Sequence, residues 1–280
     1  GLKNPWNPFP RVRFTERPDV AVIHLLEGHV LVLVDTTASV LIAPSTLWHH
    51  LQHAEEYHTN PLVGTYIRWV RYIAVFASVF LMPVWLLFAL EPGLLPPVLK
   101  FIGPSHPGKI PLLAQFVIAE IAVDMIRQAT LHIDTALSTA VGIVAAVVVG
   151  QYAAQIGLLD PEVIIYTAVA AVGTFLTPSF ELSMANRLVR LLLLLLTGIW
   201  RLPGLIVGTA AFFLLLVTSR SFGVPYLWPL IPFSWPALKA VLLRSPVPVS
   251  NIRPEALHPR DATRRAVPEP ARKPRREERR

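Results

Sequence analysis

Long apolar runs, separated by short polar or proline-rich segments, dominate the chain between residues 72 and 218. Most of these runs approach the roughly 20 residues that an α-helix needs to cross the hydrocarbon core of a bilayer. We expect six membrane passes, over residues 72–90, 110–134, 135–155, 163–177, 188–200 and 202–218. The second and fifth could instead be re-entrant or interfacial. The pattern therefore predicts an all-α polytopic membrane protein with four to six transmembrane helices.

The predicted helix over residues 110–134 carries three charges in an otherwise apolar run, namely Glu120, Asp124 and Arg127. At roughly 100° per residue, this spacing places all three within about 60° on one helical face. Intramembrane charges face protein or water and mark functional sites by default. The face could line a path for ions or small solutes, or the charges could neutralise one another and only fix helix packing. Its formal sum of one negative charge would favour cations in the first case.

A second polar region follows the short run 163–177, which Pro178 interrupts. Glu181 and Asn186 then lie near a helix break, where transport proteins often build ion sites. We therefore treat them as further candidates for the ion pathway. A plain cytoplasmic turn, rich in arginine under the positive-inside rule, explains the same segment equally well.

Small residues recur every four positions in two of the predicted spans. Such strips let helix backbones approach closely in a membrane, so they predict helix packing and not chemistry. The residues concerned are Ser138, Gly142, Ala146, Gly150 and Ala154 in the third span, and Gly204 and Gly208 in a tight hairpin around Arg201.

The first 43 residues are more polar and predict a short α+β segment. Pro18 suits the first turn of a helix over residues 19–27, and Gly28 suits its C-terminal cap. Two short β-rich runs, 29–34 and 40–43, predict a strand pair. So few elements cannot bury a core of their own, so we expect residues 1–43 to be the end of a larger cytoplasmic domain whose beginning is missing.

Residues 44–71 are expected to form a juxtamembrane amphipathic region, with a helix over 44–58. Within it, His49 and His53 have the spacing of metal ligands. The segment has no HExxH motif and approaches the membrane, so we interpret the histidines as a solvated or interfacial face and expect no metal site.

The flanks of the spans indicate orientation. Arg68 and Arg71, with neighbouring aromatic residues, predict a basic anchor on the cytoplasmic side. Residues 221–244 are rich in aromatics and prolines and predict an interfacial segment, and the basic, proline-rich residues 245–280 predict a disordered tail. Both termini are therefore expected in the cytoplasm.

Composition supports this description. Hydrophobic residues make up 53% of the 280 residues and charged residues 15%, and the mean hydropathy is +0.52. These values are typical of an integral membrane protein. The net charge of +7 lies near the membrane flanks and in the tail, so it does not indicate nucleic-acid binding. No GxSxG, P-loop, dinucleotide-binding glycine pattern or HExxH occurs, so we expect neither an enzyme nor a cofactor.

Four long runs carry a family resemblance: RVRFTERPDVAVIHLLEGH (11–29), LWHHLQHAEEYH (47–58), VPYLWPLIPF (224–233) and IRPEALHPRD (252–261). They resemble, in order, the A subunits of spore germination receptors, the GerA family. The resemblance implies a protein of the spore inner membrane that acts in germination, in a family of oligomeric, nutrient-gated ion channels. It also implies that a cytoplasmic N-terminal domain is absent from this chain, and that no amino-acid site should be expected here.

From these observations we expect a membrane subunit that forms or regulates an oligomeric ion-conducting pathway during endospore germination. The alternative is a non-conducting scaffold for other germination proteins or for those that release dipicolinic acid. The expected partners are membrane lipid, further copies of the same chain and other germination membrane proteins.

Overall fold

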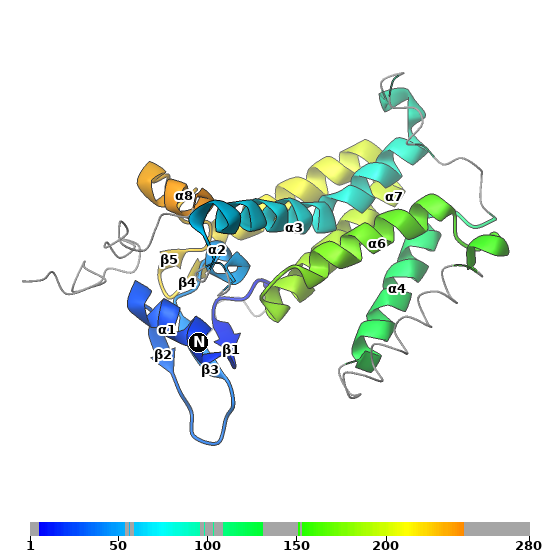
Figure 1. Ribbon diagram of the computed structural model, residues 1–280. Coiled ribbons are helices and arrows are strands. Elements are labelled where there is room, and N and C mark those ends of the chain that lie inside the picture. Colours follow the sequence, from blue (N-terminus) through cyan, green and yellow to red (C-terminus); the bar gives the residue numbers. More distant parts are fainter. Residues whose placement is uncertain are drawn as a thin grey trace, which may run out of the picture.

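The computed structural model describes residues 6–53, 56, 59–95, 98, 103, 109–130, 151 and 153–243. Long helices lie together, and a small α/β unit, residues 13–51, sits at one end of them (Figure 1). The described helices are α1 (Pro18–Glu27), α2 (Leu47–Leu51), α3 (Pro61–Leu90), α4 (Leu112–Thr130), α6 (Pro161–Phe175), α7 (Phe180–Thr218), α8 (Trp235–Leu242) and the 3-10 turn η2 (Pro92–Leu94). The strands are β1 (Arg13–Thr15), β2 (Val30–Val32), β3 (Val40–Ala43), β4 (Arg220–Ser221) and β5 (Val224–Pro225).

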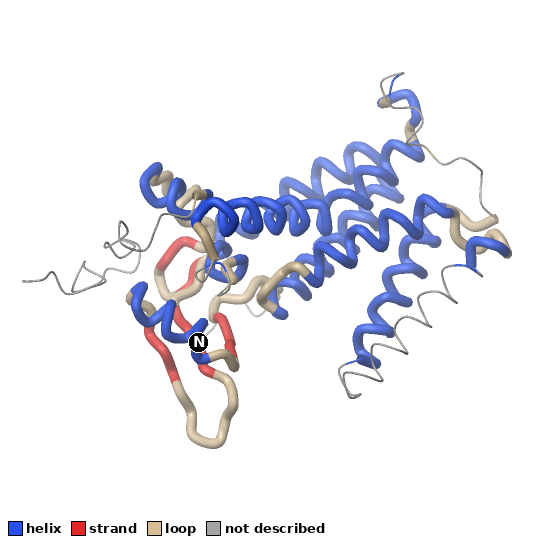
Figure 2. The backbone as a smooth tube through the Cα atoms, in the orientation of Figure 1, coloured by secondary structure: helices blue, strands red, loops and turns tan. Residues whose placement is uncertain are grey.

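The small α/β unit confirms the predicted helix and strand pair. Gly28 ends α1 in the left-handed conformation, with φ of 98°, as expected for a glycine cap. β2 and β3 pair antiparallel, and β1 adds to the other edge of β3 to give the order β1-β3-β2 (Figure 2). β1 was not predicted, because three residues are too few to show an alternating pattern.

The expected helix over residues 44–58 is wrong in extent, since α2 ends at Leu51 and Gln52 is extended, with φ of −76° and ψ of 140°. Two arginines explain why the helix stops there. The Leu51 carbonyl accepts a hydrogen bond from Arg71 Nη1 at 3.1 Å, and the Gln52 carbonyl accepts one from Arg13 Nη2 at 3.2 Å. Side-chain donors thus satisfy carbonyls that a longer helix would have used.

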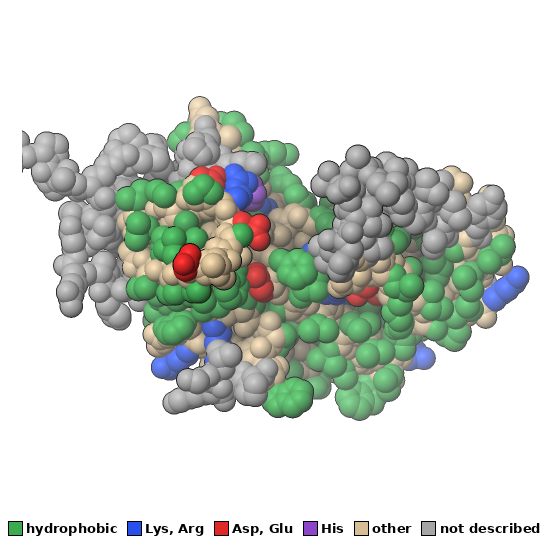
Figure 3. All heavy atoms as spheres, turned by 90° about the horizontal axis from the view of Figure 1, so that it is seen from below, with side chains coloured by type: hydrophobic (Ala, Val, Ile, Leu, Met, Phe, Trp, Pro, Cys, Tyr) green, Lys and Arg blue, Asp and Glu red, His purple; other side chains and the backbone are tan. Residues whose placement is uncertain are grey.

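The first long helix begins earlier than residue 72. Asn60 caps α3 by accepting from the Leu62 backbone N–H at 3.2 Å, and Pro61 occupies the first turn, where its missing N–H is not needed. α3 and α7 are the two described helices that are long and apolar enough to cross a membrane, while α6 is apolar but shorter. Hydrophobic side chains form broad areas of the visible surface (Figure 3).

The helix α7 is a hairpin of two helices, as the sequence predicts. Arg201 has φ of 54° and ψ of −131°, which breaks the helical path. A Cβ added at Gly204 would overlap the carbonyl oxygen of Leu196, and one at Gly208 would lie 2.7 Å from Leu193 Cδ2. Both glycines therefore lie where the two arms of the hairpin are in contact.

Two apolar clusters hold the helices together. One joins the C-terminal half of α3 to α4, α6 and α7, and the other joins α3 and α7 to Phe9, Leu51 and Tyr226. Tyr226 is fully buried, so the segment 221–244 is in part a packed element and not only an interfacial anchor. The expectations for residues 245–280 and for most of the third span, 135–150, lie outside the described residues.

Candidate functional site

Arg190 on α7 links all four long helices. Its Nη2 lies 2.7 Å from Glu120 Oε2 on α4, and its Nη1 donates to the Ser78 carbonyl on α3 at 2.6 Å and to Thr174 Oγ1 on α6 at 3.2 Å. The side chains of Arg190 and Glu120 are 1% and 5% exposed. Burial removes both charges from water, so the pair depends on these several hydrogen bonds for its stability. The Glu120 charge is therefore paired with an arginine on another helix.

Asp124 is more exposed than Glu120, which lies one turn before it on α4. It forms an ion pair with Arg187 on α7, and the two side chains are 41% and 9% exposed, respectively. Asp124 lies four residues after Glu120 and Arg187 three residues before Arg190, so the two pairs form successive rungs between α4 and α7. The Glu120–Arg190 pair is buried from water, whereas the Asp124 side of the Asp124–Arg187 pair is partly exposed.

Arg127 is held by polar and aromatic contacts. Its Nη1 donates to Ser183 Oγ on α7 at 3.0 Å. Its guanidinium carbon lies 5.6 Å from the ring centre of Phe175 and 5.1 Å from that of Phe180, distances at which a cation is attracted to an aromatic face. Arg127 therefore anchors α4 to the start of α7.

The arginines of α7 change the charge balance that the sequence indicated. Glu120, Asp124 and Arg127 sum to −1, but Arg187 and Arg190 contribute two positive charges, so the five groups sum to +1. In the sequence, the positive-inside rule explained these two arginines as well as an ion site did. Their pairing with α4 could not be predicted from α7 alone, because it depends on how the two helices meet.

The two candidates after Pro178 lie in different surroundings. Ser179 Oγ donates to Glu181 Oε2 at 2.8 Å and is itself 3.0 Å from His50 Nδ1. Glu181 is therefore connected to α2 through Ser179. Asn186 is 6% exposed, one residue before Arg187 on α7. Asn186 is thus buried on α7 next to Arg187 in the sequence, whereas Glu181 contacts Ser179.

Of the predicted packing residues, Ser138, Gly142, Ala146 and Gly150 lie outside the described residues, and Ala154 is partly buried near the end of its helical segment. The sequence analysis missed Gly173 on α6. A Cβ there would overlap the Ala74 carbonyl oxygen on α3 and lie 2.9 Å from Ser78 Cβ. This glycine allows the backbones of α3 and α6 to approach each other closely. It does not belong to a four-residue repeat of small residues, so the sequence pattern did not reveal it.

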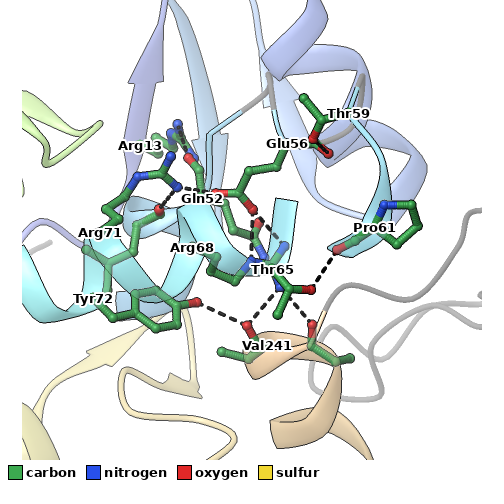
Figure 4. Close-up of polar contacts among 12 residues, drawn as sticks. Arg13, Gln52, Glu56, Thr59, Pro61, Thr65, Arg68, Arg71, Tyr72 and Val241 are labelled. Carbon is green, nitrogen blue, oxygen red and sulfur yellow. Dashed lines mark hydrogen bonds and ion pairs between the residues drawn. The ribbon is translucent and has the colours of Figure 1, made fainter. Parts of the chain in front are cut away.

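A second buried charge cluster joins the α/β unit to the helices (Figure 4). Glu56, which is 2% exposed, accepts from Arg68 Nε at 2.8 Å and also pairs with Arg71. Arg68 Nη1 and the Tyr72 hydroxyl both donate to the Val241 carbonyl on α8, at 2.8 and 3.1 Å. The prediction that Arg68 and Arg71 form a basic membrane anchor is therefore wrong for the described structure, since both are buried against protein.

The histidines of α2 are also buried, which contradicts the expected solvated face. His49 and His50 are 5% and 0% exposed. Burial, with Arg13 nearby, lowers the pKa of His50 to about 3, so it is neutral at physiological pH. Among the described residues, side chains in metal-ligand proximity occur in the α/β unit, at His24, Glu27 and His29, and not between α4 and α7.

Comparison with known families identifies the group to which this architecture belongs. The model of the Bacillus/Clostridium GerA spore germination protein matches residues 2–256. The chain belongs to the GerA family. The resemblance seen in the four sequence runs is therefore confirmed.

Several curated proteins are similar to this GerA-family chain. It is 49% identical over 259 residues to stage V sporulation protein AF of Bacillus subtilis (strain 168), which covers 92% of this chain and 52% of that protein. It is 34% identical over 269 residues to spore germination protein KA of the same organism, covering 94% and 49%. It is 31% identical over 244 residues to the membrane protein YfkQ, again from that organism, covering 86% and 48%. The chain thus spans about half the length of these relatives. No solved structure matches it.

Proposed function

We propose that this GerA-family chain is a membrane subunit that forms or regulates an oligomeric ion-conducting pathway in the spore inner membrane during germination. Membership of a spore germination family supports the process, and the apolar helices α3 and α7 support the membrane setting. In this proposal the chain has four to six membrane passes with both termini in the cytoplasm. It assembles with further copies of itself and with other germination membrane proteins, and it performs no catalysis.

One observation carries the conducting part of the proposal, namely that the Asp124 side chain is 41% exposed within a largely apolar helix. An exposed carboxylate in a membrane must face water or protein. In an oligomer, copies of Asp124 could surround a water-filled path, with Arg187 setting how strongly each carboxylate attracts a cation. Glu120 would line the same path only if its pair with Arg190 opened, because Glu120 is buried in the described structure.

The scaffold alternative rests on the Glu120–Arg190 ion pair. The Glu120–Arg190 pair is nearly inaccessible to water, as expected of a device that fixes helix packing and is indifferent to ion flow. If Asp124 is covered by a partner protein in the same way, the whole α4–α7 face is structural. The chain would then act in germination by holding other proteins.

Ion leak and protein level, measured together, separate the two functions. We expect Asp124→Asn to lower cation leak across liposomes that contain the full chain, with the amount of folded protein unchanged. Glu120→Gln should instead reduce the amount of folded protein. Glu16→Gln, which changes an exposed carboxylate near the start of the chain, is the matched control and should change neither. Normal leak in Asp124→Asn, together with a reduced amount of folded protein in Glu120→Gln, would contradict the conducting function and favour the scaffold.

A further inference from the structure

Three buried side chains with metal-ligating atoms meet in the α/β unit, where the proposed function has no use for them. His24 and Glu27 lie on α1, and His29 follows the glycine that ends it. They are 2%, 5% and 3% exposed. One ring nitrogen of each histidine and one carboxylate oxygen all lie within 4.8 Å of one another. The left-handed Gly28 turn is what brings His29 back beside α1.

The hydrogen bonds of His29 fix which of its nitrogens can bind a ligand. Its Nδ1 lies 3.0 Å from the His24 carbonyl oxygen, and because a carbonyl only accepts, Nδ1 carries the ring proton. Nε2 therefore presents a lone pair. A ligating histidine whose other nitrogen donates to a backbone carbonyl is the usual arrangement around bound metal ions, since that bond orients the ring and raises its basicity.

His24 offers Nδ1, which makes no hydrogen bond and lies 3.7 Å from Glu27 Oε2. Its Nε2 is 3.1 Å from Arg13 Nη1, and because a guanidinium only donates, Nδ1 bears the ring proton in the metal-free protein. A metal ion at Nδ1 would take the place of that proton, which then moves to Nε2. Arg13 must give up this one contact, and it retains acceptors in the carbonyl oxygens of His49 and Gln52.

The neighbouring His49 does not complete the set. Its ring centre is 4.5 Å from that of His29, but its Nδ1 accepts from the Thr46 backbone N–H at 3.1 Å, at the start of α2. The four-residue spacing of His49 and His53 therefore does not mark a metal site. The candidate metal site is formed instead by side chains that meet in space around the end of α1.

We propose that His24, Glu27 and His29 bind a divalent transition-metal ion. Two imidazole nitrogens and one carboxylate suit zinc best among the common ions. The ion would connect the end of α1 to the chain that leads into β2. It would thereby act as a structural cross-link in the α/β unit next to the membrane helices. A site of this kind binds only when the unit is folded, so binding also stabilises the fold.

Zinc binding by the full chain tests the proposal directly. The tag-free protein in detergent is treated with a chelator, desalted and titrated with Zn²⁺, with Co²⁺ absorption as a second readout of the ligand set. We expect close to one Zn²⁺ per chain and a melting temperature that rises with Zn²⁺. His29→Ala should weaken Zn²⁺ binding at least tenfold, and His53→Ala, which removes a histidine outside the group, should leave binding unchanged.

Glu27→Gln covers the case in which His29→Ala fails to fold. Glutamine nearly matches glutamate in size but carries no charge, so the variant should fold without metal, bind Zn²⁺ at least tenfold more weakly and lose the Zn²⁺-dependent rise in melting temperature. Absence of stoichiometric binding by the parent chain would overturn the proposal. So would an equal loss of binding in His53→Ala and Glu27→Gln, which would mean that adventitious surface histidines hold the ion.

Discussion

Arg190 Nη2 lies 2.7 Å from Glu120 Oε2, and this ion pair connects α7 to α4 where both side chains are almost fully buried. The same guanidinium also binds α3 and α6 through the Ser78 carbonyl and the Thr174 hydroxyl. The stripe on α4, seen in the sequence as three charges on one helix, is thus one side of an interface. The charges of Glu120 and Asp124 are paired with Arg190 and Arg187, which lie 70 and 63 residues away in the chain.

Replacing Glu120 tests whether the Glu120–Arg190 pair is shielded from water. Glu120→Gln leaves Arg190 buried without a counter-charge, and breaking a buried pair costs about 3 to 5 kcal/mol. We expect a large fall in the melting temperature of the detergent-solubilised chain. Asp124→Asn, at the half-exposed rung, should lower it by much less, because water screens that pair. Equal effects of the two changes would mean that the two rungs share one environment.

The sequence pattern correctly predicted those features of the fold that depend on neighbouring residues in the chain. Pro18 and Gly28 bound α1 as expected, and the break at Arg201 gives the expected hairpin, because caps and breakers act over a few residues. The burial of Glu56, Arg68 and Arg71 could not be read from sequence. Arginines beside aromatics before an apolar run look the same whether they face lipid headgroups or a carboxylate from another segment. The convergence of His24, Glu27 and His29 was missed for a similar reason, since it needs the Gly28 turn as well as the spacing.

His50 should make the chain sensitive to acid. Its pKa falls from 6.5 to about 3 on folding because burial, reinforced by the Arg13 charge, disfavours the protonated ring. The unfolded chain therefore binds the extra proton first, and stability is lost as pH falls below 6.5, at about 1.4 kcal/mol per pH unit until about pH 3.

The His50→Gln variant isolates this contribution, since an amide can form a hydrogen bond with Ser179 Oγ in place of the ring but does not titrate here. Melting temperatures measured at pH 7.5 and pH 5 should fall less for His50→Gln than for the parent. His24 and His49, whose pKa values burial also lowers, remain in both proteins. An identical fall in the two would show that His50 takes up no proton on unfolding in this range.

Gly173 should be intolerant of even one added methyl group. A Cβ there would overlap the Ala74 carbonyl oxygen, which belongs to the backbone of α3 and cannot rotate away. Gly173→Ala should therefore separate α3 from α6 and destabilise the chain by about 1 to 3 kcal/mol, the usual range for overpacking. Gly93→Ala is the control, because nothing lies within 4 Å of the Cβ position there. Thermal melting of both variants in the same detergent provides the comparison, and similar melting temperatures would contradict the close approach.

The Glu56 cluster should hold the α/β unit, α3 and α8 together. Glu56 pairs with both Arg68 and Arg71, so Glu56→Gln leaves two guanidinium groups, 4% and 7% exposed, without their shared carboxylate. We expect destabilisation of about 3 to 5 kcal/mol. Because Arg68 also binds the Val241 carbonyl, α8 should loosen, and trypsin should cleave after Lys239 sooner than in the parent.

Two control variants assign that effect to the buried charges. Tyr72→Phe removes one neutral hydrogen bond to the Val241 carbonyl, which contributes about 1 kcal/mol, so its effect on α8 should be small. Glu16→Gln changes an exposed carboxylate and should have no effect. If Glu56→Gln and Tyr72→Phe expose Lys239 to trypsin at the same rate, α8 is held by its own packing, and the Glu56 cluster does not couple it to the α/β unit.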